Sequence, residues 1–409
     1  MLRSTGGGVR HAPRLWKVWI AAPVAITMAS ALGWFLYQRV VVSPAVHGAA
    51  PIEVVKITLA LIAAIGAVLT GVYAYRKQRL GEGDAARADA DQLTQRYSMA
   101  AEQLGHDKAA VRLAGVYAMA RLADEWPKQR LPVLLRGRRE AIEHEGRQQC
   151  IDVLCAYVRM PAEAQTGASE SEVRATIVRT IASHLRDNSA ISWVKHNFDF
   201  AGAALHDADF GDVTFSGEYT SFGGATFSGE HTKFDHATFS GQGTWFDHAT
   251  FSGEYTSFGG ATFAGEHTRF DHATFSGTNT WFGAATFSGQ TTTFDDATFA
   301  GKNTRFDHAT FSAEHTSFGG ATFAGEHTSF DHATFSGETT WFDHATFSAE
   351  HTNFGGATFA GEHTSFDHAT FPGATTADAA TLQASFVGST VRWGPISPRP
   401  IPSPAAGTR

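Results

Sequence analysis

A twelve-residue unit fills most of the C-terminal half of this 409-residue chain and constrains its fold more than any other feature. From Phe222 to Phe371 the pattern F-x-x-A-T-F, followed by six residues, recurs thirteen times. Successive Phe residues are therefore alternately five and seven positions apart, and thirty of the 32 Phe residues fall on this lattice. Such self-similarity at a fixed short period indicates a solenoid, in which each turn of the chain packs on the one before.

The small residues of the unit predict which side chains form the core. Residues two apart on an extended backbone point to the same side, so each Phe and the small residue two positions before it face inward. The Thr between them faces solvent, where its β-branch favours extended backbone, and Gly, Asp and Ser supply the corner turns. The predicted core ladder includes Phe222, Phe227, Phe234, Phe239, Phe246, Phe251, Phe258 and Phe263, with Ala225 and Ala237.

The A-x-F-x-x pattern resembles the pentapeptide-repeat family, whose usual repeat is A-(D/N)-(L/F)-x-x. The resemblance covers residues 198–394 and implies an all-β, right-handed, quadrilateral β-helix with four repeats per coil. Strict spacings of five occur only at the two ends, around Phe210 and from Thr376 to Val391. The two extra residues in every twelve predict bulges at alternate corners and a 24-residue coil, which consists of two units. Coils of one unit or of three units are the alternatives.

Two uncharged apolar runs, 18–37 and 57–75, predict two N-terminal transmembrane helices within residues 1–80, because each is long enough to cross a bilayer core of about 30 Å. Basic residues precede the first run and follow the second, so the positive-inside rule predicts a multi-pass cell-membrane protein with both termini cytoplasmic. The alternative is a cleaved signal peptide, which the length of the first run and the presence of a second run disfavour.

Residues 81–190 predict a small all-α connector. Helical apolar spacing occurs in Ala109–Glu125, Arg147–Arg159 and Ser171–Arg186, and places Tyr117 on the packing side of the first of these. The segment 97–126 resembles the short helical module that precedes pentapeptide repeats in membrane-anchored bacterial proteins. A basic insertion at 127–146 fits either anionic lipid or a solvated loop. Residues 395–409 are rich in Pro and predict a disordered tail.

Candidate chemical groups are few. The motifs FDHATF and GEHT place many His beside Asp or Glu, but a dyad copied along a repeat is typical of solvated corner residues, and an active site needs one asymmetric pocket. With two units per coil, the His form stacked pairs, and adventitious metal binding between them is the alternative. His106, His144 and His184 are expected as isolated surface residues. The only two cysteines, Cys150 and Cys155, are interpreted as packing thiols. We therefore expect no catalytic residues, no cofactor and no metal.

Charge is unevenly distributed and guides the functional prediction. Residues 198–394 hold 23 acidic and five basic residues, a net charge of −18, whereas the rest of the chain is basic. The leading hypothesis is a non-enzymatic, membrane-tethered scaffold that binds an unknown protein partner, and a homodimer is compatible with it. The acidic charge disfavours direct nucleic-acid binding. The alternative is mimicry of DNA toward an enzyme such as DNA gyrase, which the resemblance implies for some members of the family.

Overall fold

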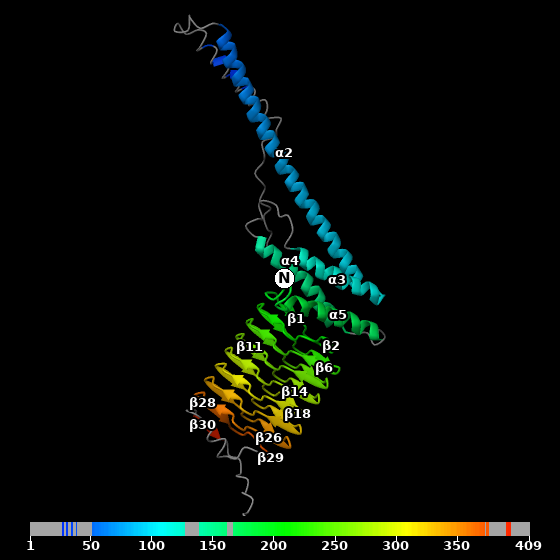
Figure 1. Ribbon diagram of the computed structural model, residues 1–409, viewed down its shortest axis with the longest axis vertical. Coiled ribbons are helices and arrows are strands. Elements are labelled where there is room, and N and C mark those ends of the chain that lie inside the picture. The colour runs from blue at the N-terminus through cyan, green and yellow to red at the C-terminus, as the bar shows by residue number, and fades with distance from the viewer. Residues whose placement is uncertain are drawn as a thin grey trace, which may run out of the picture. The chain divides into compact units, whose positions relative to one another are not determined.

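The computed structural model of the protein (Figure 1) describes residues 51–126, 139–161, 167–372, 374–375 and 390–393, together with a few single residues between 27 and 38. The chain divides into two units, Met1–Ala88 and Asp89–Arg409. Helix α2, Pro51–Leu104, begins in the first unit and ends in the second. The predicted tail at 395–409 lies outside the described residues.

The predicted membrane anchor finds no support. No helix formed by the described residues combines the length and the hydropathy that a crossing of the bilayer requires. The run 18–37 lies almost wholly outside those residues. The run 57–75 is one part of the 54-residue helix α2, which continues without a break into the charged segment that follows. The orientation of the termini and the cellular location stay predictions.

Three further helices form the predicted connector: α3 (Ala109–Glu125), α4 (Arg139–Arg159) and α5 (Gly167–Leu185). The predicted apolar stripes of α4 and α5 are buried. The predicted packing side of α3 is partly wrong, because Tyr117 is 61% exposed while Arg112 is buried. Arg112 can be buried because its guanidinium lies 3.1 Å from the buried carboxylate of Glu170 on α5. The part of the basic insertion at 127–138 falls outside the described residues.

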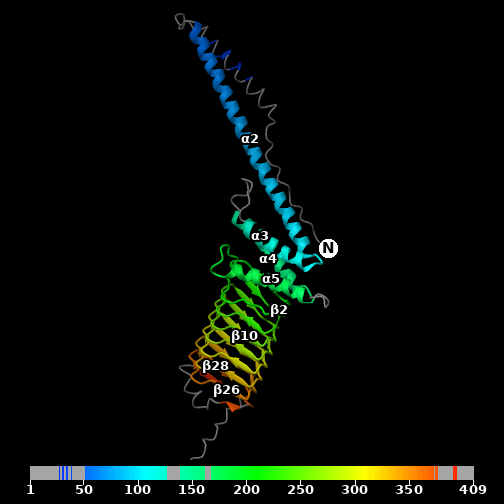
Figure 2. The same cartoon turned by 45° about the vertical axis from the view of Figure 1, so that its right-hand side comes forward.

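The repeats form a parallel β-solenoid of four sheets, in which the chain visits each sheet once per coil (Figures 1 and 2). Two of these sheets, separated by the other two, consist mainly of three-residue strands and are named here by one strand each. The β12 face comprises β1 (Phe198–Asp199), β4 (Tyr219–Ser221), β8 (Gly243–Trp245), β12 (His267–Arg269), β16 (Thr291–Thr293), β20 (His315–Ser317), β24 (Thr339–Trp341), β28 (His363–Phe366) and β30 (Thr390–Trp393). The opposite β10 face comprises β6 (His231–Lys233), β10 (Tyr255–Ser257), β14 (Asn279–Trp281), β18 (Asn303–Arg305), β22 (His327–Ser329), β26 (His351–Asn353) and β29 (Ala374–Thr375).

The two intervening sheets are built from the Thr-Phe pairs of the repeat. One comprises β2 (Ala204–His206), β5 (Thr226–Ser228), β9 (Thr250–Phe251), β13 (Thr274–Phe275), β17 (Thr298–Phe299), β21 (Thr322–Phe323) and β25 (Thr346–Phe347). The other comprises β3 (Thr214–Phe215), β7 (Thr238–Phe239), β11 (Thr262–Phe263), β15 (Thr286–Phe287), β19 (Thr310–Phe311), β23 (Thr334–Phe335) and β27 (Thr358–Phe359). A four-sided solenoid of parallel coils is thus confirmed, and its right-handed sense stays a prediction.

Strand register confirms a coil of two twelve-residue units and excludes coils of one unit or of three. Phe227 pairs with Phe251, and Phe251 with Phe275, so each coil advances the chain by two units. The rings stack along the axis, with centroids 4.6 Å apart and planes 3° apart for Phe227 and Phe251. The ladder side chains are completely buried, namely Phe222, Phe227, Phe234, Phe239, Phe246, Phe251, Phe258, Phe263, Ala225 and Ala237. Burial of each aromatic ring stabilises the stack through both apolar area and ring contact.

The helical connector covers the open end of the first coil. Its apolar core is continuous with the Phe ladder and includes the buried side chain of Trp193. The side-chain amide of Gln148 donates to the carbonyl of Asn197, and the guanidinium of Arg186 donates to the carbonyl of Gly211. A solenoid needs such a cap, because an uncovered end would expose the core and the unpaired backbone groups of its first coil.

Candidate functional site

The His-rich corners have the stacked pairs that the 24-residue coil predicts. Ring centroids of His248 and His272 lie 4.8 Å apart, with planes 6° apart. Three more pairs stack in the same way, with centroids 4.9 to 5.2 Å apart: His308 with His332, His327 with His351, and His344 with His368. Within the described chain, no group of three or more His, Cys, Asp or Glu residues is placed to hold a metal ion.

Backbone conformation explains why most of these corner His residues interchange with Gly. In the turn that follows Phe234, the N–H of Ala237 donates to the carbonyl of Phe234 at 3.1 Å, and His236 has a φ of 56°. The same turn position has a positive φ in other coils, where it is occupied by Gly260 or by Ala284. Gly adopts this left-handed conformation without cost, and His and Asp are enriched there. The FDHA and FGGA variants of the unit can therefore form the same turn.

The Asp residues at these corners connect neighbouring coils. The hydroxyl of Ser317 donates to Oδ1 of Asp295, one coil earlier, and the N–H of Gly319 donates to the same oxygen at 2.8 Å. Asp343 receives the equivalent pair from Ser365 and Asp367. Burial raises the pKa of Asp295, and the hydrogen bond from Ser317 opposes that shift. These contacts give the corner carboxylates a structural role that the repeat pattern alone did not reveal.

One His that was expected on the surface is instead part of the cap, so that prediction is wrong. His184 stacks on Trp193 with centroids 4.0 Å apart, and its Nε2 lies 3.2 Å from the Asp124 carboxylate. Asp124 also accepts from the indole N–H of Trp193 at 2.9 Å. Burial disfavours the charged imidazole, but the hydrogen bonds to Asp124 and to the Thr180 carbonyl raise the pKa of His184. The cluster fastens α5 to the start of the solenoid.

The cysteines are packing residues, as predicted. Cys150 and Cys155 are both buried in α4. Burial raises the pKa of the Cys150 thiol to about 12, and it raises that of Cys155 further. Neither thiol is therefore a nucleophile at neutral pH.

The large exposed aromatic side chains of the solenoid, Tyr255, Trp281 and Trp341, lie on the two faces of three-residue strands. The β10 face exposes Tyr255 by 39% and Trp281 by 44%. Ser257 pairs in register with Lys233 on one side and with Trp281 on the other. Because Ser257 is much shorter than its two neighbours in this row, it forms the floor of a hollow. The volume of this hollow is about 260 Å³.

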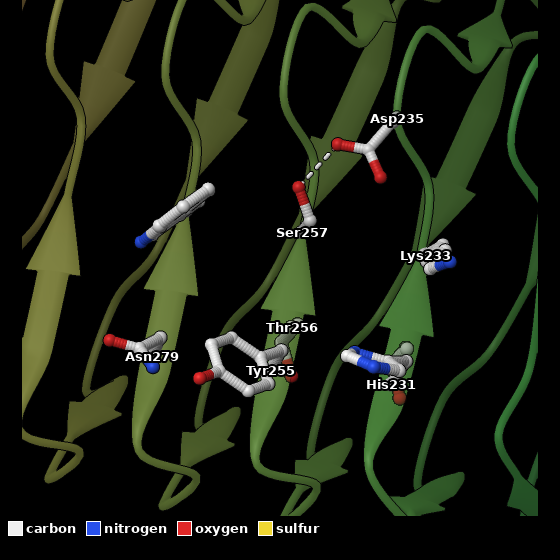
Figure 3. A pocket seen from close by; sticks show the side chains of 9 residues that line it. His231, Lys233, Asp235, Tyr255, Thr256, Ser257 and Asn279 are labelled. Carbon is white, nitrogen blue, oxygen red and sulfur yellow. Dashed lines mark hydrogen bonds between the residues drawn. The ribbon is translucent and has the colours of Figure 1, made fainter.

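Figure 3 shows the hollow from outside. The ring of Tyr255 turns one side toward the viewer, and the imidazole of His231 lies on the adjacent strand, with ring centroids 5.3 Å apart. The hydroxyl of Ser257 is held by a hydrogen bond to Asp235 at the corner. The residues of the predicted core ladder are completely buried inside the solenoid and cannot reach a ligand. The sequence signal that could have identified this surface was the replacement of a small residue by Trp at three positions of a regular repeat, Trp245, Trp281 and Trp341.

Comparison with known proteins identifies no relative: no protein-family profile, curated protein or solved structure matches the chain.

Proposed function

We propose that the protein is a non-enzymatic scaffold whose solenoid binds a partner protein on the β10 face. The observation that carries this proposal is the hollow between Lys233 and Trp281, which is lined by aromatic, basic and polar side chains and by the carboxylate of Asp235, to which Ser257 is hydrogen-bonded. Trp, Tyr and Arg are the residues most often responsible for binding energy at protein interfaces. Attachment of this scaffold to a membrane through 18–37 and 57–75 stays a prediction, and the proposed binding does not depend on it.

The rigidity of the surface also supports binding. Every strand of β6, β10, β14 and β18 is hydrogen-bonded to the strand before or after it in the stack. The side chains are thus presented on a backbone that is already ordered, so association costs little additional conformational entropy. A flexible loop that presented the same residues would bind more weakly.

A photocrosslinker tests the proposal. Tyr255 is replaced by p-benzoylphenylalanine in the full-length chain, in the cells that make it, and the matched control carries the same replacement at Tyr219 on the β12 face. We expect an adduct of constant mass from position 255 that is absent from position 219 and is lost when Trp281→Ala is added. Equal adducts at both positions, or none at position 255, would contradict the proposal.

DNA mimicry is the second candidate, and the net charge of −18 on residues 198–394 favours it. The β10 face is unsuited to such mimicry, because its strands β6, β10, β14 and β18 contain no carboxylate. A supercoiling assay with DNA gyrase and the full-length protein separates the two candidates. Inhibition that persists in the Trp281→Ala variant would favour mimicry over the scaffold.

A further inference from the structure

A Tyr-Trp-Arg triplet occurs twice in the solenoid, once on each of its two opposite faces. Tyr219, Trp245 and Arg269 lie on successive strands of the β12 face. Their equivalents three repeat units later in the chain, Tyr255, Trp281 and Arg305, lie on successive strands of the β10 face. Because a coil holds two units, a copy three units later is displaced by one and a half coils. It therefore falls on the opposite side of the solenoid.

The two copies differ in how their Arg is neutralised. On the β12 face, Arg269 lies 3.1 Å from Asp247 and 3.2 Å from Asp271. At the positions three units later, Asp247 is replaced by Gly283, whereas Asp271 is matched by Asp307, whose Oδ1 accepts from the Ser329 hydroxyl and from the N–H of Asp331. Within the part of the chain that the structure describes, Arg305 has no ion-pair partner. The positive charge of Arg269 is therefore neutralised by neighbouring carboxylates, whereas the charge of Arg305 is available to an anionic ligand.

The corners beside the β10 triplet are also less acidic than elsewhere. The corners that precede the three strands carry Glu254, Thr278 and Lys302 on the β10 face, where the β12 triplet has Glu218, Gln242 and Glu266. Lys302 lies 3.3 Å from Glu326, so that carboxylate is compensated. The solenoid as a whole is strongly acidic, yet this surface carries three of the five basic residues found in 198–394: Lys233, Lys302 and Arg305.

The spacing of the two outer cations defines the ligand. Lys233, Ser257, Trp281 and Arg305 occupy one row, each in register with the next. Three coil steps of about 4.8 Å place the backbones of Lys233 and Arg305 about 14 Å apart. Four residues of an extended chain span about the same distance. A peptide with acidic residues at positions i and i+4 can therefore reach both cations while its central side chain enters the hollow.

We propose that the β10 face binds an extended acidic peptide segment of the partner protein, with one carboxylate on Lys233, the other on Arg305, and an apolar side chain packed between Tyr255 and Trp281. This inference rests on the proposed scaffold function. Charge complementarity supplies the orientation and the association rate, and burial of the central side chain against two aromatic rings supplies affinity. Recognition uses side chains alone, because the strands beneath are already paired.

Fluorescence anisotropy with the full-length protein tests this inference. The probe is a fluorescein-labelled peptide, Asp-Thr-Leu-Thr-Asp, and the reference peptide has Asn at both ends. We expect the reference to bind at least tenfold more weakly, and the double variant Lys233→Ala/Arg305→Ala to lose a similar factor for the Asp peptide. The control variant Arg269→Ala, which removes the equivalent Arg on the β12 face, should bind it as the unchanged protein does. The side chains of Lys233, Arg269 and Arg305 are exposed, so melting curves should stay similar.

Three results would overturn the inference. The first is no binding of the Asp peptide, and the second is equal binding by all variants. The third is that polygalacturonate, an acidic polysaccharide used as a non-peptide anion, binds the β10 face and the peptide does not. The photocrosslink at position 255 separates this failure from failure of the scaffold proposal. If the adduct forms at 255 and the Asp peptide does not compete with it, only the acidic-peptide inference fails. If no adduct forms at 255, the scaffold proposal fails as well.

Discussion

Ala284 occupies a turn position that L-amino acids adopt only at a cost, with a φ of 55°. We predict that Ala284→Gly increases the free energy of unfolding by about 1 kcal/mol, because Gly removes the steric penalty of the left-handed conformation. Urea unfolding followed by circular dichroism measures the change. The adjacent Ala285 is a fully buried ladder residue without a positive φ, so Ala285→Gly should instead decrease stability by about 1 kcal/mol. A loss of stability in Ala284→Gly would contradict this account of the corners.

At this scale the sequence predicted inward and outward positions well, because side-chain direction follows directly from alternation along extended backbone. It did not reveal the function of the corner residues. The bond between Ser317 and Asp295 joins residues 22 positions apart, and only the coil length brings them together. Arg112 is a similar case: its partner Glu170 lies on another helix, so the periodicity of α3 alone could not show that Arg112 is buried.

The junction between helices and solenoid contains a His whose protonation should weaken the cap. His196 is buried and stacks on His144 with ring centroids 4.3 Å apart. Burial, followed by the proximity of His144 and Arg147, lowers the pKa of His196 to about 4. A His with a depressed pKa in the fold contributes stability above its unfolded pKa of about 6.5, and this stability is lost as pH falls toward 4.

We therefore predict that the melting temperature of the helical signal falls between pH 6.5 and 4.5, and falls less in His196→Phe. Phe preserves the stack on His144 but takes up no proton. Carboxylates also titrate in this range, so the informative quantity is the difference between the two proteins at each pH. His184, whose pKa is raised, is present in both proteins, so it adds little to the difference. Parallel curves for the two proteins would contradict the prediction.

Among the elements, repeats and helices were predictable to different degrees. The alternating spacing of Phe predicted the strands, the corners and a two-unit coil, whereas coils of one or three units were excluded only by the strand register. The membrane prediction depended on two apolar runs read in isolation, and helix α2 extends far beyond the second of them. The exposed surface was the least predictable. Its Trp residues were visible in the sequence, but the face they occupy follows only from the number of residues per coil.

Each coil of the solenoid contacts mainly its neighbours, so whole coils should be removable. We predict that deletion of residues 306–329, one coil, leaves a folded protein with an unchanged circular dichroism signal per residue and a similar melting temperature. Deletion of residues 306–323 should instead destabilise the protein, because it joins two positions that are not successive in the repeat. Limited proteolysis locates the damage, and cleavage near the junction in the longer deletion would contradict the prediction.

The relation between the twelve-residue unit and the 24-residue coil has an evolutionary consequence. Gaining or losing one unit amounts to half a turn, so every later side chain would change sides while the interior stayed the same. Trp341, now on the β12 face, would then emerge on the side that carries Trp281. Unequal recombination in such a gene can therefore rearrange what the molecule displays to its surroundings, and an even number of units merely lengthens it.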